Sequence, residues 1–210
     1  MTENSRTPTP IDTIADAWVD TIAELEPTVA TYIGRFEHNG RYGDYSPEGH
    51  ERVVAAARST LADLTAAEPV DDIDRVTKAD LSRELELDLE LADAQWHLRD
   101  LNVIASPAQD IRAVFDLMPT DTPEDWSVIS ERLGALPAAI EGYVATLREG
   151  AARGVVPARR QVVEVAAQIA RYTDDSGFFA EFTAEAAPAD GQLPASLARD
   201  LAAPAGAARG

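Results

Sequence analysis

The sequence predicts an all-α protein, a bundle-like array of several helices with no significant sheet. Three observations lead to this prediction. Apolar residues recur at helical spacing along most of the chain, and Ser, Thr or Pro residues stand at the start of several of these segments. The stretch from Lys78 to Leu98 contains no Gly, no Pro and no β-branched residue. It therefore favours a long helix, around which the other helices are expected to pack.

The middle of that stretch, Glu84 to Leu91, alternates acidic residues with leucine, which is the pattern of a half-buried strand. We predict a helix there because Leu, Glu and Ala are good helix formers. At about 100° per residue, the apolar side chains fall on two nearly opposite lines of the helix. The first line holds Leu81, Leu85, Leu89, Ala92 and Trp96, and the second holds Leu87, Leu91, Ala94 and Leu98. A helix with two apolar stripes is expected to be covered by other helices on both sides.

Residues 1–8 are expected to be disordered, and the first helix is expected to follow them. Thr9 suits the N-cap position and Pro10 the first helical position. Pro27 ends this helix and can open a short one that stops at Gly34.

Residues 37–49, EHNGRYGDYSPEG, are dense in turn-forming residues and are predicted to form a surface loop. Ser46-Pro47-Glu48 then begins a helix that reaches about Leu64, and residues 68–74 connect it to the central helix. The side chains expected to face inward from this helix are Val53, Val54, Ala57 and Leu61.

The second half of the chain is predicted to be helical as well. Ser106-Pro107 starts a short helix that Pro119 closes. Thr122-Pro123 starts a long one, in which Asp125 can complete a capping box and Pro137 can cause a kink. The long helix could run to Gly150, and Gly154 suits a C-terminal stop.

Pro157 is predicted to open a further helix, with apolar residues on one side at Val162, Val165, Ala166 and Ile169. An aromatic segment, 176–186, completes a single helical domain over residues 9–186. Residues 187–210 are rich in Ala, Pro and Gly and are expected to form a frayed tail.

The composition excludes several classes of function. The 210 residues have a formal net charge of −19 at pH 7, which argues against nucleic acid and anionic membrane surfaces as partners. The absence of cysteine excludes disulfides, thiolate nucleophiles and cysteine metal sites. The first ten residues have neither a basic nor an apolar leader region, and no stretch is long and apolar enough to span a membrane. We expect a cytoplasmic protein.

The three histidines do not form a recognisable metal motif. An H-E-x-x-H helix needs two histidines four residues apart, but His50-Glu51 is followed by Val54 at the required position. We therefore predict no metal ligand and no catalytic residue in this chain. His97 is interpreted as a helix-end residue that bonds a carbonyl group.

Two groups of residues are weak candidates for ligand or anion contacts. The predicted loop gathers His38, Tyr42, Tyr45 and His50, which could face a ligand or belong to an ordinary structured loop. The other group is a cluster of arginines in an otherwise acidic chain, at Arg148, Arg153, Arg159 and Arg160. Our main interpretation is that these arginines pair with acids of the same protein. The alternative is that they bind an anionic ligand or a peptide carboxylate.

The order of several short motifs resembles a known bacterial family, "domain of unknown function 885", whose members are helical proteins similar to zinc metallopeptidases. The resemblance covers most of residues 10–186. The most specific motif is LREGAARGVVP at 147–157. The others are ATYIG at 30–34, DYSPEG at 44–49, WHL at 96–98, SPAQDI at 106–111, TPEDW at 122–126 and RLGALP at 132–137.

The resemblance implies that zinc belongs to the full-length family proteins, in which an H-E-x-x-H-type motif lies downstream of this region. No such motif occurs here, so this chain is expected to be inactive alone. We interpret it as the non-catalytic N-terminal helical portion of a metallopeptidase-like protein, either a truncated reading frame or a fragment. Its expected partners are the missing C-terminal part or a second copy of itself. The alternative is a stand-alone helical module for binding or oligomerisation, without enzymatic activity.

Overall fold

The computed structural model describes residues 6–189 and 192–207, and this part of the chain is all-α and contains no strand. The α-helices are α1 (Pro10–Leu25), α2 (Pro27–Tyr32), α3 (Pro47–Ala66), α4 (Asp72–Asp93), α5 (Pro107–Ala113), α6 (Pro123–Arg153), α7 (Arg159–Thr173), α8 (Phe178–Ala184) and α9 (Ala195–Ala207). Short 3₁₀ helices are η1 (Phe36–His38), η2 (Trp96–Arg99) and η3 (Val114–Leu117). The all-α prediction is confirmed. None of the described helices is both long and apolar enough to cross a membrane.

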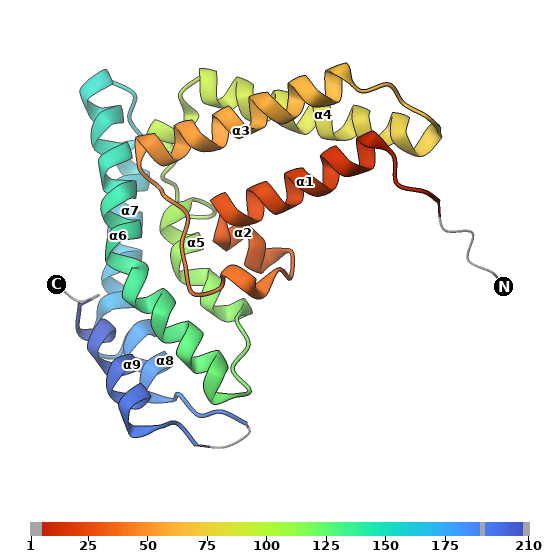
Figure 1. Cartoon of the computed structure of the whole chain (residues 1–210). Helices are drawn as coiled ribbons and strands as arrows, with labels where there is room; N and C mark the ends of the chain where they lie inside the picture. Colours follow the sequence, from red (N-terminus) through yellow and green to blue (C-terminus); the bar gives the residue numbers. More distant parts are fainter. Residues whose placement is uncertain (1–5, 190–191, 208–210) are drawn as a thin grey trace.

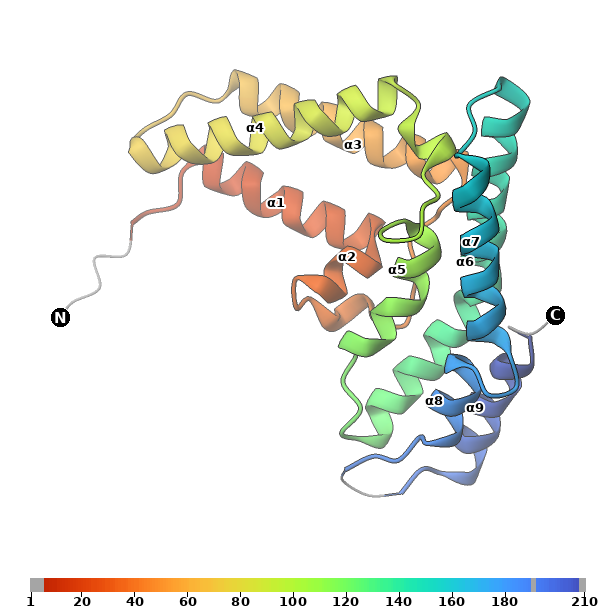
Figure 2. The ribbon, with the colours of Figure 1, turned by 180° about the vertical axis from the view of Figure 1, so that it is seen from behind.

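The helices form two arms that meet at an angle (Figure 1). One arm consists of α1, α3 and α4, and the other follows α6, with α7 beside it and α8 and α9 at its far end (Figures 1 and 2). Each arm has its own buried cluster. The first cluster contains Ile11, Ala57, Leu64 and Leu85. The second contains Ile111, Val114, Phe115, Met118, Trp126, Ile129, Leu133, Leu136, Phe179 and Leu201.

Local sequence signals set several helix boundaries as predicted. Thr9 caps α1 by accepting a hydrogen bond from the Asp12 amide, and the Asp12 carboxylate accepts one from the Thr9 amide in return. Thr122 and Asp125 form the same capping box at the start of α6. Gly154 ends α6 with a φ of 74°, a left-handed conformation that glycine adopts without a steric penalty.

The central helix differs in extent from the prediction. Helix over Glu84–Leu91 is confirmed, but α4 begins earlier, with Asp71 as its N-cap, and ends at Asp93. Gln95 then takes a left-handed φ of 57°, and η2 follows. The chain turns because Leu98 packs against α6: a Cβ on Gly150 would lie 2.3 Å from the Leu98 carbonyl oxygen. This close approach places Leu98 in a fully buried position.

Only one side of α4 is covered within the described residues, which corrects the expectation of helices on both sides. Leu85 is buried between α4, α1 and α3, whereas Leu87 and Leu91 are 48% and 40% exposed. Ile73 and Val76 are exposed as well and lie on the same line of the helix. We call these four side chains, Ile73, Val76, Leu87 and Leu91, the outer stripe of α4.

The described residues near both ends of the chain, from Arg6 and up to Ala207, are more ordered than the sequence suggested. Residues 1–5 lie outside the described part, but Arg6 forms ion pairs with Asp12, Asp71 and Asp74, so disorder does not extend to residue 8. The predicted frayed tail contains α9, which packs on α6 and α8. Leu193, Leu197 and Leu201 recur at helical spacing and contact the second cluster, which explains why this Ala-rich segment is anchored.

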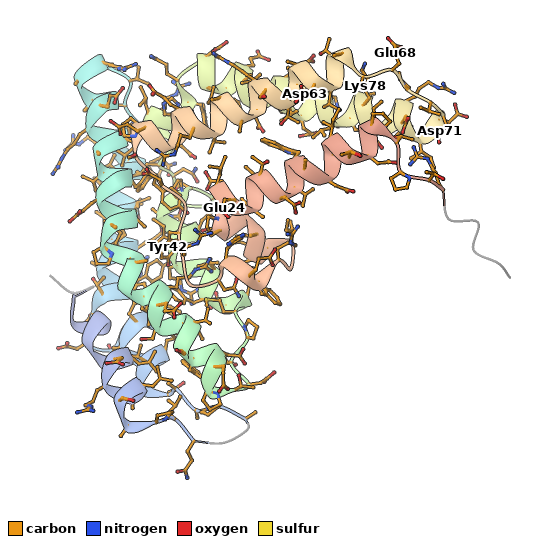
Figure 3. The ribbon with its side chains drawn as sticks, viewed as in Figure 1. Glu24, Tyr42, Asp63, Glu68, Asp71 and Lys78 are labelled. Carbon is orange, nitrogen blue, oxygen red and sulfur yellow. The ribbon has the colours of Figure 1, made fainter. Side chains whose placement is uncertain are left out.

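The predicted surface loop before α3 is largely inserted into the protein. Tyr42 packs against the second cluster and donates a hydrogen bond to the Ile111 carbonyl at 2.7 Å. Figure 3 shows Tyr42 where this segment passes α6. Arg132 of α6, which is fully buried, donates to the Arg41 carbonyl at 2.8 and 3.0 Å. The loop is therefore tied to α6 through its backbone, a contact that turn propensity alone does not reveal.

Candidate ligand pocket

A pocket of about 370 Å³ lies where the two arms meet. Its walls are mainly apolar and come from α1, α3, α4, η2, α5 and α6. The apolar residues that line it are Trp18, Ile22, Val53, Val54, Ala57, Leu89, Leu91, Ala92, Trp96 and Pro107. The pocket is thus built by segments that are distant in the sequence and converge only in the fold.

The floor of the pocket is fixed by hydrogen bonds from α6. The Tyr143 hydroxyl donates to the Asp100 carbonyl at 2.6 Å, and the Thr146 hydroxyl donates to the Tyr45 carbonyl at 2.7 Å. Gly142 allows this approach, because a Cβ there would lie 3.0 Å from the Ser46 amide nitrogen. The loop, η2 and α6 are therefore held against one another around the pocket.

Two histidines lie at the edge of the pocket and stack on each other. The rings of His50, in the first turn of α3, and His97, in η2, have centroids 3.6 Å apart and planes inclined by 21°. His50 Nε2 and His97 Nδ1 are buried and have no hydrogen-bond partner among the described residues. The interpretation of His97 as a residue that bonds a carbonyl therefore does not hold for Nδ1.

The surroundings of this pair favour neutral imidazoles. Burial lowers the pKa of His97 to about 4, and repulsion by His50 and Arg153 adds to the effect. Burial also lowers the pKa of His50, although the nearby Glu51 carboxylate opposes the shift. At neutral pH the two rings therefore carry no positive charge toward the pocket.

Four carboxylates line the same pocket: Glu26, Asp44, Asp88 and Asp100. Burial, together with the charge of Asp44, raises the pKa of Glu26 to about 7. Burial likewise raises the pKa of Asp88 and of Asp100. Asp44 is exposed and pairs with Arg52 at 2.6 Å, whereas no lysine or arginine among the described residues pairs with Glu26, Asp88 or Asp100.

The bacterial family of unknown function DUF885 matches residues 27–209. The chain belongs to this family. No curated protein matches the sequence. The matched range contains every pocket residue from Asp44 onward, whereas Trp18, Ile22 and Glu26 lie before it.

The fold of this DUF885 chain separates the predicted loop residues. Tyr45 and His50 line the pocket. Tyr42 points instead toward α5 and α6, where the Arg132 guanidinium lies 5.3 Å from its ring. His38 lies 3.6 Å from Glu24 near the end of α1 and is not among the residues that line the pocket. Only half of this predicted group therefore shares one site.

The arginines do not form one anion site either. Arg153 pairs with Glu149 and borders a second hollow behind the histidine pair, while Arg160 borders a different hollow beside Gln161. Arg148, Arg159 and Arg160 are exposed and form no ion pair within the described residues. The interpretation that the cluster pairs with acids of the same protein thus holds for Arg153 alone.

The residues present do not fit the zinc ion that the DUF885 resemblance implies for the full-length proteins. A zinc site needs at least three protein ligands arranged around one point. His50 and His97 are the two imidazoles that come together, and no group of three or more His, Cys, Asp or Glu side chains in the described residues could hold a metal. That the chain binds no metal stays a prediction.

Proposed function

We propose that this DUF885 chain is a non-catalytic helical binding unit that holds a small organic ligand in the pocket between its two arms. The observation that carries the proposal is the pocket itself. Its volume of about 370 Å³ falls in the range of small-molecule sites, and its apolar walls carry a few convergent polar groups, as such sites do.

The chemistry of the polar groups supports binding rather than catalysis. The imidazoles face each other, and the hydroxyls of Tyr143 and Thr146 are already engaged with backbone carbonyls. Among the described residues that line the pocket, no hydroxyl bonds to an imidazole or a carboxylate, so no nucleophile is paired with a base there. These groups can recognise a ligand without transforming it.

A second candidate function rests on the exposed apolar surface of α7. Val162, Val163 and Ile169 are each more than 40% exposed on this helix, and the outer stripe of α4 is exposed too. Such surfaces often mark interaction sites. They support the reading of the chain as a helical portion of a larger metallopeptidase-like protein, in which it would supply one wall of a substrate cleft.

The first proposal is tested by measuring ligand binding to the pocket, and by blocking the pocket with a larger side chain. Benzyltrimethylammonium and 2-phenylethanol are titrated into the whole chain, and binding is followed by calorimetry. At least one of them should bind saturably, and Ala92→Phe should abolish that binding because Ala92 lines the pocket. The matched control Ala62→Phe, at an exposed position of α3 outside the pocket, should bind as the unaltered chain does. Equal binding by both variants would contradict the proposal.

A further inference from the structure

The pocket has an unbalanced charge. Four carboxylates line it, of which Asp44 is paired with Arg52 at 2.6 Å; no lysine or arginine is among the described lining residues, and the two imidazoles are held neutral. Desolvation raises the pKa of Glu26, Asp88 and Asp100, which have no ion-pair partner among the described residues; Glu26 and Asp100 are half-buried, and Asp88 is exposed. A ligand that brought a positive charge would remove this penalty.

We infer that the ligand of the pocket is an organic cation, a substituted ammonium group attached to an apolar body, with the Glu26 carboxylate as its anchor. This inference rests on the proposed function and adds the chemical class of the ligand. The apolar walls would cover the body of the ligand, and the carboxylates would surround its charged end.

Glu26 is held rigidly at the junction of α1 and α2. Its amide donates to the Ile22 carbonyl at 2.7 Å, and its carbonyl accepts from the Ala30 amide at 3.0 Å. Its carboxylate forms no ion pair with any described residue and is packed against the loop, where a Cβ on Gly43 would lie 2.8 Å from Oε2. The backbone of Glu26 is therefore fixed and its carboxylate already lies against the loop before a ligand arrives, which reduces the entropy lost on binding.

The aromatic lining suits the same class of ligand. Trp18 and Trp96 both line the pocket, and indole faces attract cations. The Arg99 guanidinium already lies 4.9 Å from the Trp96 ring centroid, so this indole makes such a contact within the protein itself. An anionic ligand would instead meet Glu26, Asp88 and Asp100, which have no ion-pair partner among the described residues.

The inference is tested with three probes of similar size and different charge: benzyltrimethylammonium, 2-phenylethanol and 3-phenylpropionate. Calorimetry at pH 8 and low salt should show the cation binding at least about tenfold more tightly than the alcohol, since a buried counter-charge strengthens the attraction. The carboxylate probe should not bind measurably. Glu26→Gln should remove most of the preference for the cation over the alcohol, whereas Glu24→Gln, at an exposed position near the end of α1, should leave it unchanged.

The outcomes separate the inference from the proposed function. Equal affinity for cation and alcohol, both lost in Ala92→Phe, would overturn the inference and leave the pocket as a binding site. No saturable binding by any probe would contradict the proposed function. Circular dichroism checks that each variant is folded. If Glu26→Gln is not folded, Asp100→Asn is tested in its place. An unchanged preference in the folded replacement would likewise overturn the inference.

Discussion

His50 and His97 stack face to face with their ring centroids 3.6 Å apart, and this contact joins α3 to the turn that follows α4. Each ring keeps one buried nitrogen that has no hydrogen-bond partner in the part of the chain that the structure describes. The pair also separates the candidate pocket from a second hollow that Arg153 borders. A change in the charge of either imidazole should therefore alter the packing where the two arms meet.

Acid should weaken the fold through this pair. The folded-state pKa of His97 is lowered to about 4, so the unfolded chain binds a proton more readily between that value and its ordinary pKa of 6.5. The stability contribution is complete above pH 6.5 and falls as the pH drops toward 4. Between pH 7 and 5, urea unfolding should show a loss roughly 1 kcal/mol greater in the unaltered chain than in His97→Phe, after allowance for solvent screening. Equal losses of the free energy of unfolding in the unaltered chain and in His97→Phe would show that protonation of the pair does not destabilise the fold.

Glu26 should have the opposite pH dependence. Its folded-state pKa of about 7 is raised above the ordinary value of 4.5, so its contribution is complete below pH 4.5 and is lost as the pH rises through 7. Without ligand, Glu26→Gln should be more stable than the unaltered chain by roughly 1–3 kcal/mol at pH 8, and the difference should vanish near pH 4.5. Urea unfolding at both pH values measures it, with Glu24→Gln as the exposed control. A destabilised Glu26→Gln at pH 8 would contradict the account of an uncompensated charge.

Arg132 should be essential for the stability of the fold. Its guanidinium is fully buried and donates to the carbonyls of Arg41 and Pro27 and to the Thr31 hydroxyl, with no carboxylate among its partners. Arg132→Met would leave these acceptors unpaired, which should lower the free energy of unfolding by roughly 3–5 kcal/mol. Arg148→Met, at an exposed arginine without an ion pair, should change it by less than about 0.5 kcal/mol. Similar values for the two variants would show that the loop does not depend on Arg132.

The outer stripe of α4 should promote self-association. Adding salt screens the repulsion between copies of a chain with a net charge of −19, so association should tighten as the salt concentration rises. The double variant Val76→Glu and Leu87→Glu, at two stripe positions outside the pocket lining, should remove this association. The control variant, Ala62→Glu with Ala66→Glu, adds the same charge on an exposed face of α3 and should weaken self-association much less. Sedimentation at several salt concentrations gives the answer, and a monomer at every concentration would contradict this prediction.

Local signals in the sequence predicted the helix boundaries well because capping depends on residues that are neighbours in the chain. The Thr9–Asp12 and Thr122–Asp125 boxes and the Gly154 stop are all of this kind. The end of α4 was predicted too late because it is set by packing of Leu98 against Gly150, a contact between distant segments.

Most of the candidate site could not be predicted from the sequence, because it too is formed by contacts between distant segments. Tyr45 and His50 were identified because they lie in one short segment, but Glu26 resembles an ordinary residue between two helices, and nothing local pairs His97 with His50. Arg132 is one arginine on an amphipathic helix, and its burial follows only from the path of the loop that covers it. A charged residue flanked by apolar positions at helical spacing is the one signal that could have drawn attention to it.

The three tryptophans offer the most direct measurement of the central claim, that the pocket binds a ligand. Trp18 and Trp96 line the pocket, whereas Trp126 is buried in the second cluster with its indole N–H bonded to the Thr120 carbonyl at 3.0 Å. Titration with benzyltrimethylammonium, followed by the three indole N–H signals in a nitrogen–proton correlation spectrum, should shift the signals of Trp18 and Trp96 saturably and leave that of Trp126 unchanged. Three unmoved signals at saturating probe, or a shift of Trp126 as large as the others, would contradict the account.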